Sequence, residues 1–402
     1  MSATTEPNVG SFTLGGPPTA EPAAPIEVPE HDEWTVPNGF AWVFPGEGNH
    51  SGLVRPVILA DGFNLGPSRL DVLYQGLEGG EFPFIGELRR RGRDVILLGF
   101  EERSASILAN AEAAEATIMR AIAEQVDEAR LVVGGFSMGG IITRYALAKL
   151  ETAEKDHRTG LYFSYDSPHR GASVPVGVQA FSHFIPFPNK FAKQMDSQAA
   201  RQMLWQHYDK ETSKIGVAQE RTEFLEALDR VGGWPQIPMK IGVANGRADG
   251  IGLPEVKPGE VALRIERIYP DTTFYTQAQG DDVTAAHLNR RFPKAEKTIT
   301  TSGFPEVDGA PGGTLQTYGI LAGALTKLGG KVELRHEDVC FVPSVSAVAI
   351  RDVEKQDDLY VNIDGLAREE SELDDFRCSS TTTGHTAITE ELGAWLLERL
   401  PD

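Results

Sequence analysis

A serine stands between two glycines, as Gly135, Ser137 and Gly139, in the pattern G-x-S-x-G. The apolar run before it, 131–136, is typical of a buried strand, and residues 141–149 after it have helical spacing. A strand that turns sharply into a helix strains the backbone of the serine, and only small residues fit on either side. The hydroxyl then lies at a helix N-terminus, where developing negative charge is favoured. The pattern therefore predicts that Ser137 is a nucleophile.

A serine nucleophile needs a base, and histidine is the usual one. Three histidines follow Ser137 and the last of the expected parallel strands: His287, His336 and His385. His385 comes after a polar loop and before an amphipathic C-terminal segment, so its ring can reach back over the sheet. We expect it to take the Ser137 proton and return it to the leaving group. His287 and His336 lie in charged stretches and are predicted to be surface residues.

The elements that position these residues are read from the hydrophobic pattern. Apolar, strand-like runs alternate with segments of helical period, which implies right-handed crossovers and a mostly parallel sheet. The expected strands fall at 55–61, 91–100, 129–136, 160–166 and 239–245, and the longest expected helix at 105–128. The sequence therefore predicts an α/β fold with helices flanking a central sheet.

Composition excludes several classes of protein. The 402 residues are 41% hydrophobic and 24% charged, as in a soluble globular protein, with a net charge of −20. Such a charge repels nucleic-acid phosphates and anionic membranes, so neither is expected as a general partner. No apolar run is long enough for stable membrane insertion and no secretory signal is evident, which favours a cytoplasmic location. The two cysteines, Cys340 and Cys378, form no zinc motif, and no metal or other cofactor is expected.

Two segments interrupt the alternation. Residues 1–36 are rich in Pro, Ala, Thr and Glu and are predicted to form an extended or flexible tail before a single domain at 37–402. Residues 172–235 hold clustered aromatics in helix-like segments, and we expect a cap or lid there. Those aromatics either cover an acyl pocket or pack as ordinary helix core. Residues 250–335 are predicted to be a loop-rich insertion.

Four motifs together resemble one family. GGFSMGGIITRYAL, residues 134–147, is similar to the nucleophile elbow of the α/β-hydrolase superfamily, in its lipase/esterase branch. The segments DSPHRG at 166–171 and FVPSVSA at 341–347, and a Gly-His pair ending at His385, resemble further motifs of that branch. The four occur in the family's order. The resemblance implies the α/β-hydrolase fold and a catalytic triad in the order serine, acid, histidine.

The acid of that triad has three candidates. Asp249 is favoured, because it follows the strand at 239–245 as the acid does in the family. Asp166 is a rival, since some lipases carry the acid after the preceding strand, although typical bacterial relatives have a small residue there. Asp338 is the third, one residue off the spacing of the relatives. His169 and Arg170 lie on the DSPHRG loop, which in relatives mainly shapes the structure.

An oxyanion hole needs two backbone N–H groups. The resemblance assigns one to Met138, directly after the serine. The second is expected from Phe63 in the segment Asp61-Gly62-Phe63, where relatives have His-Gly, and Gly62 would allow close approach.

The resemblance implies hydrolysis of a carboxylic ester through an acyl-enzyme on Ser137, with a small-molecule or lipid-like substrate. The same triad would also suit an acyltransferase, a thioesterase or a depolymerase of polyhydroxyalkanoate-like polyesters. A catalytically silent binding protein that keeps the hydrolase fold is the alternative from another class.

Overall fold

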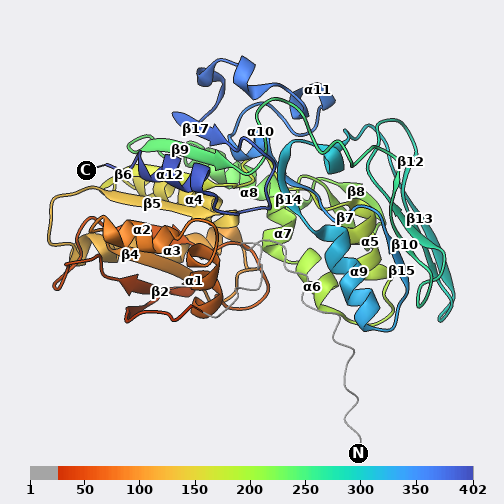
Figure 1. Cartoon of the computed structure of the whole chain (residues 1–402), viewed down its shortest axis with the longest axis horizontal. Helices are drawn as coiled ribbons and strands as arrows, with labels where there is room; N and C mark the ends of the chain where they lie inside the picture. The colour runs from red at the N-terminus through yellow and green to blue at the C-terminus, as the bar shows by residue number, and fades with distance from the viewer. Residues whose placement is uncertain (1–25, 402) are drawn as a thin grey trace, which may run out of the picture.

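The computed structural model describes residues 26–401 and contains a central eight-stranded sheet (Figure 1). The strands are ordered β1–β2–β4–β3–β5–β6–β9–β17, and every neighbouring pair from β4 to β17 is parallel, while β2 is antiparallel to both its neighbours. Their bounds are β1 Asp32–Val36, β2 Gly39–Phe44, β3 Val57–Ala60, β4 Val95–Phe100, β5 Leu131–Phe136, β6 Thr159–Tyr165, β9 Met239–Ala244 and β17 Asp375–Cys378. The predicted mostly parallel sheet is confirmed.

Helices cover both faces of this sheet. On one face lie α3 (Ile107–Glu124) and α4 (Met138–Thr152), and on the other α1 (Leu70–Glu78), α2 (Phe84–Arg90) and α12 (Glu390–Leu397). Strands buried on both faces have continuous apolar sequences, and β4 (VILLGF) is fully buried along its length. This is why the central strands could be recognised from hydrophobicity alone.

The N-terminal tail differs from the prediction. Residues 1–25 of the predicted 1–36 tail lie outside the described part of the chain, but the rest is packed. Asp32–Val36 is strand β1, whose Trp34 and Val36 are buried. Ile26 packs on the apolar core, and its carbonyl accepts a hydrogen bond of 2.6 Å from the Gln75 amide. The folded domain therefore begins before residue 37.

Helices fill the first insertion, between β6 and β9. They are α5 (Val176–Phe184), α6 (Lys190–Met195), α7 (Gln198–Met203) and α8 (Gln219–Arg230), with a short hairpin of β7 (His207–Asp209) and β8 (Lys214–Gly216). The helical character expected of residues 172–235 is therefore present. The Phe181 ring is fully buried, so at least part of the aromatic cluster is core.

The second insertion is not the loop-rich segment expected at 250–335. It forms a five-stranded antiparallel sheet, β13–β12–β11–β10–β15, which lies beside α5 and α9 at one end of the molecule (Figure 1). The bounds are β10 Val261–Ile265, β11 Thr272–Tyr275, β12 Val283–Arg290, β13 Ala295–Thr301, α9 Thr317–Lys327 and β15 Val332–Leu334. Strands with one solvent-facing side carry many polar residues, as in β13 (AEKTITT), and lack the apolar runs of the central sheet.

The two insertions pack on each other. Phe181 of α5 makes edge-on ring contacts with Phe274 of β11, at 5.5 Å between centroids, and with Tyr269, at 5.1 Å. The chain then returns through β14 (Gly312–Leu315) and β16 (Val339–Pro343), an antiparallel pair. Short helices follow before β17: α10 (Ser344–Ala347), α11 (Gln356–Leu359) and the 3₁₀ turns η2 (Ile363–Gly365) and η3 (Arg368–Glu370), while η1 (Val307–Gly309) precedes β14.

Candidate active site

Ser137 occupies the turn between β5 and α4 with φ 53° and ψ −125°, a conformation that residues other than glycine rarely adopt. Its amide donates to the Tyr165 carbonyl at 2.9 Å, which ties the turn to the neighbouring strand β6. A side chain on Gly135 would collide with the backbone of Gly139, and one on Gly139 with the carbonyl of Ala60. The glycines of the motif are therefore required by close backbone packing around a strained serine.

His385 lies against a buried carboxylate. Its Nδ1 is 2.6 Å from Oδ2 of Asp166, and both side chains are almost fully buried. The His385 amide donates to the Thr314 carbonyl of β14 at 2.7 Å, and its ring meets the edge of Phe341 at 4.8 Å. Asp166 comes directly after β6, and its other oxygen accepts a 2.9 Å hydrogen bond from the Asn245 amide. Elements distant in sequence thus fix both partners.

Asp249, the favoured acid, is not at His385. Its carboxylate pairs with Arg247 and accepts a 3.0 Å hydrogen bond from the Ile251 amide. The hydrogen bond from Arg247 lowers the pKa of Asp249. It lines a polar surface pocket of about 250 Å³ that Arg377 and Glu391 also line.

Asp249 lies away from His385 because of where β9 ends. The strand ends at Ala244, and the next residue, Asn245, faces the site instead. Its amide bonds Asp166, and its side chain donates to Thr383 Oγ1 at 2.7 Å, in the loop that carries His385. The chain has turned away by residue 249. Asp338, the third candidate, is half-buried next to Glu337, and burial, with that neighbouring charge, raises its pKa.

The structure does not join Ser137 to His385 by a hydrogen bond. The Ser137 Oγ and His385 Nε2 atoms are both buried and, among residues 26–401, neither has a hydrogen-bond partner. Ser137 is 1% exposed and His385 2% exposed. Such hydrogen bonds are often long in a ligand-free enzyme and tighten when substrate binds. The site as it stands is closed to solvent.

The predicted oxyanion donors, Phe63 and Met138, lie on two segments that adjoin Ser137. A Cβ built on Gly62 would lie 3.4 Å from the Ser137 Cβ, so the loop carrying Phe63 passes directly beside the serine. Met138 is the first residue of α4, and its N–H therefore has no acceptor within the helix. In the described part of the chain, neither the Phe63 nor the Met138 N–H donates a hydrogen bond.

Asp61 holds that loop. Its Oδ1 accepts from the Gly62 amide at 2.7 Å, and its Oδ2 accepts from the Ser68 hydroxyl at 2.6 Å. Burial raises the pKa of Asp61, against the opposing effect of Arg103. Asp61 thus acts as a brace for the loop.

The DSPHRG and FVPSVSA segments form a framework under the site. The Arg170 amide donates to the Ser346 hydroxyl at 2.9 Å, and that hydroxyl donates to the Gly171 carbonyl, also at 2.9 Å. His169 bonds the Ser164 hydroxyl at 2.9 Å and packs on Trp234. Burial and nearby arginines hold the pKa of His169 well below its usual value, so it is neutral. These contacts match the structural role expected of the loop.

The other two histidines differ from each other. His287, on β12, is exposed and bonds the Thr298 hydroxyl at 3.1 Å, as expected of a surface residue. His336 is 9% exposed and lies 3.3 Å from the Glu260 carboxylate, so its predicted surface position is wrong. The charged residues around it in sequence face outward, while its own ring is covered by the second insertion.

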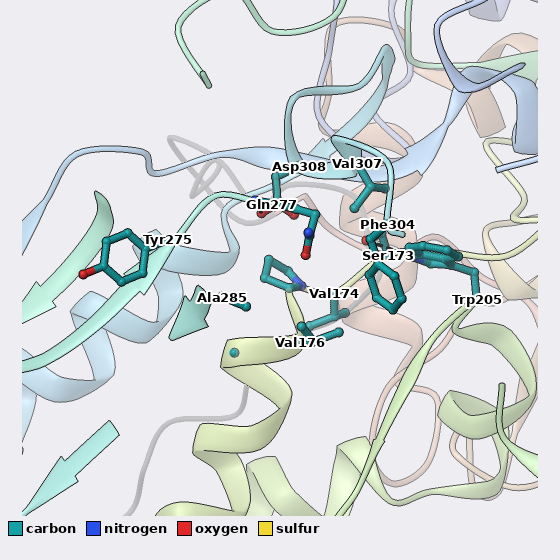
Figure 2. A pocket seen from close by; sticks show the side chains of 12 residues that line it. Ser173, Val174, Val176, Trp205, Tyr275, Gln277, Ala285, Phe304, Val307 and Asp308 are labelled. Carbon is teal, nitrogen blue, oxygen red and sulfur yellow. Dashed lines mark hydrogen bonds between the residues drawn. The ribbon is translucent and has the colours of Figure 1, made fainter. Parts of the chain in front are cut away.

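A small cavity lies between the two insertions and is lined by residues from both, among them Trp205 and Asp308 (Figure 2). The Ser173 amide at its edge donates to the Phe341 carbonyl at 2.7 Å. Its volume of about 10 Å³ holds about one water molecule. Figure 2 shows Asp308 next to Gln277 on one side and Trp205 with Phe304 on another. The sequence analysis did not identify Asp308. Burial raises the pKa of this carboxyl to about 6.

Two further residues were missed. A side chain on Gly313 of β14 would collide with the Asp166 carboxylate, and Asn245 positions both Asp166 and the histidine loop. Neither has a sequence signal of its own. Within residues 26–401, no group of three or more His, Cys, Asp or Glu side chains is arranged to hold a metal ion.

Comparison with known proteins supports the fold. Residues 94–155, which include β5, Ser137 and α4, match the model of the phospholipase/carboxylesterase family of α/β-hydrolases. A search of curated proteins found no significant match. The chain has the α/β-hydrolase fold, and the partial family match, which covers the elbow, supports an ester-hydrolysing enzyme.

Solved structures that resemble the chain are distant. A Bacillus licheniformis lipase, BlEst2, is 11% identical, with a TM-score of 0.33, over 52% of this chain and 72% of its own. An esterase from Pyrobaculum calidifontis is 13% identical, with a TM-score of 0.33, over 54% and 67%. The esterase Est22 is 11% identical, with a TM-score of 0.34, over 53% and 63%.

Proposed function

We propose that the protein is a serine hydrolase that cleaves a carboxylic ester, with Ser137 as nucleophile, His385 as base and Asp166 as the acid. The observation that carries the proposal is the buried 2.6 Å contact between His385 Nδ1 and Asp166 Oδ2, beside a serine held at φ 53°. Asp166 replaces Asp249 in the role expected from the sequence. An acceptor at Nδ1 fixes the tautomer that leaves Nε2 free to take a proton.

The chemistry needs only groups of this chain and water. His385 Nε2 takes the Ser137 proton as Oγ attacks the ester carbonyl, and the Phe63 and Met138 N–H groups stabilise the oxyanion. The carbon–oxygen bond to the alcohol breaks, and the alcohol leaves with the proton from Nε2. Water then attacks the acyl-enzyme, gives its proton to Nε2 and releases the acid, with the proton returned to Oγ.

Access to this site requires a local opening, because Ser137 is 1% exposed. We assign the covering role to the helical insertion at 172–235, which begins directly after the DSPHRG loop and packs on the second insertion through Phe181. Within residues 26–401, no helix is long and apolar enough to cross a membrane. The cytoplasmic location stays a prediction.

The test is covalent labelling with a fluorophosphonate, mapped by mass spectrometry. We expect stoichiometric labelling of Ser137 that is lost in Ser137→Ala and His385→Ala. Ser344→Ala is the matched control, because Ser344 is also buried with an unpartnered hydroxyl but is not the proposed nucleophile. Absence of labelling in a folded sample would favour the silent binding protein. Labelling that survives in His385→Ala would overturn the assignment of the base.

A second measurement separates hydrolysis from the alternatives on the same triad. Oxygen-ester and thioester substrates of increasing chain length are compared, with and without an added alcohol. We expect the free acid as product. A transferred ester as the main product would show an acyltransferase, and preference for the thioester a thioesterase.

A further inference from the structure

Three turns lie together at one end of the second insertion. The turn after β10, residues 266–271, is tied to the end of β12 by two hydrogen bonds between Thr272 Oγ1 and the Asn289 backbone, at 2.8 and 3.1 Å. It is also tied to the turn between α9 and β15, residues 328–331, because the Glu266 amide donates to the Lys331 carbonyl at 2.7 Å. The β12–β13 turn, residues 290–294, follows at the same end.

The end of α5 joins this group. The Arg290 guanidinium lies over the Phe184 ring, 4.9 Å from its centroid, and donates to the Phe184 and Pro293 carbonyls. Phe187 follows three residues after Phe184. We give the name basic end to six exposed residues of these turns and of the segment after α5, three apolar and three basic: Phe187, Arg267, Ile268, Arg291, Phe292 and Lys294. The turn 266–271 also exposes the carboxylates of Glu266 and Asp271.

The apolar members of the basic end are unusually exposed. Phe292 is 90% exposed, Ile268 42% and Phe187 38%. Phe292 sits at the tip of a hairpin, and packing does not require an aromatic side chain there. An exposed aromatic on a projecting turn costs solubility and marks a contact surface when others lie near it.

The charges of the basic end oppose those of the molecule. The turns 266–271, 290–294 and 327–331 hold six basic residues and two carboxylates, and a third carboxylate, Glu296, follows in β13, in a chain of net charge −20. One carboxylate, Glu266, pairs with Lys331. In the described part of the chain, Arg267, Arg291 and Lys294 have no ion-pair partner. Because screening in salt limits such charges to about 10 Å, the basic end acts locally and the distant acidic surface does not cancel it.

Basic side chains around an exposed aromatic are the groups that dock a protein on an anionic lipid surface. The cations bind lipid phosphates, and the aromatic ring enters the region between headgroups and acyl chains. We propose that the basic end docks the protein reversibly on an anionic lipid–water interface. The net charge alone argued against anionic membranes as partners, and the uneven distribution of that charge reverses the expectation at this one end. The proposal does not depend on the chemistry of Ser137.

The test is vesicle flotation with the full chain. Vesicles of phosphatidylcholine alone are compared with vesicles that also contain phosphatidylglycerol. We expect binding to the anionic vesicles that falls at least tenfold when salt rises from about 0.05 to about 0.5 M, because the Debye length shortens. Equal binding to both vesicles, or no binding to either, would overturn the proposal.

A triple variant, Arg291→Gln, Phe292→Ser and Lys294→Gln, locates the surface. Its control is Arg230→Gln, Ile237→Ser and Lys155→Gln, which removes an arginine, a lysine and an exposed apolar side chain at positions elsewhere. We expect the first to lose at least tenfold in vesicle affinity and the second to bind as the unmodified chain does. Equal loss in both would show a general charge effect and reject the basic end. Thermal unfolding of each variant checks that the fold is kept.

A fluorescent probe at position 292 measures directly whether this residue enters the lipid. The variant Phe292→Cys is labelled with an environment-sensitive dye. Labelling is selective because Cys340 and Cys378 are both buried, whereas the new thiol is accessible. We expect a blue shift on anionic vesicles and none with soluble polyphosphate. A response to polyphosphate alone would assign the basic end to a soluble polyanion and reject the lipid interface.

Discussion

Oδ2 of Asp166 lies 2.6 Å from Nδ1 of His385, across 219 residues of sequence, and both side chains are buried. A buried carboxylate against an imidazole orients the ring and stabilises the imidazolium when it forms. The pair is held by β6 on one side and by β14 and the loop before α12 on the other.

Replacing the acid tests this relationship. We expect Asp166→Asn to lower kcat by about ten-thousandfold, as the loss of the correct tautomer does in serine proteases. Asp249→Asn is expected to keep kcat within about twofold, because Asp249 pairs with Arg247 at the surface. Steady-state hydrolysis of a short p-nitrophenyl ester measures both. The reverse ranking of the two variants would restore Asp249 as the acid.

The absence of a side chain on Gly313 leaves room for the Asp166 carboxylate. A methyl group there would collide with Asp166 Oδ2, so we expect Gly313→Ala to lower kcat by about a hundredfold through displacement of the carboxylate. Gly323→Ala is the control, since nothing lies within 4 Å of a Cβ at that position in α9. The control is expected to gain about 0.5–1 kcal/mol in unfolding free energy. An unchanged kcat in Gly313→Ala would show that the backbone there yields.

Asp61 braces the loop that carries the Phe63 amide. We expect Asp61→Ala to lower kcat about tenfold or more with little change in KM, because an oxyanion donor acts mainly in the transition state. Asp71→Ala removes an exposed carboxylate paired with Arg69 and serves as the control. A rise in KM at constant kcat would mean that the loop contacts the substrate rather than the oxyanion.

Asp308 makes stability depend on pH. Burial raises its pKa to about 6 in the folded state, against about 3.9 in the unfolded chain. The folded state therefore holds the extra proton between about pH 4 and 6, and stability is lost as pH rises through this window, by about 3 kcal/mol at most.

Asp308→Asn is expected to remove that loss and to keep the hydrogen bond from the Gln277 amide, now 2.9 Å. Denaturant unfolding of both proteins at pH 4.5 and pH 7 measures this change in stability. The variant should gain stability relative to the unmodified chain at pH 7 and much less at pH 4.5. Parallel pH profiles for the two proteins would show that Asp308 titrates normally.

Much of the fold follows from local sequence. Strands such as β4 and β5 are buried on both faces and therefore carry unbroken apolar runs, and alternation with helices implies the parallel sheet. The second insertion has no such signal, because its strands bury one face and pair in a separate antiparallel sheet. Strand β1 also went unrecognised, since a composition rich in Pro and Glu precedes it.

The candidate site also has parts that local sequence predicts and parts that it does not. The position of Ser137, Met138 and the glycines around them at a strand–helix turn can be predicted from sequence, because a sharp turn between adjacent elements allows few residue types. His385 was predicted as the base from its place between a polar loop and a helix, and the structure puts its ring against a buried carboxylate. Which carboxylate lies against His385 is visible only in the tertiary structure: Asp166 and Asp249 both follow parallel strands, and sequence does not reveal which of them faces the histidine loop. The course of the chain beyond β9, where Asn245 takes the place next to Asp166, makes that choice.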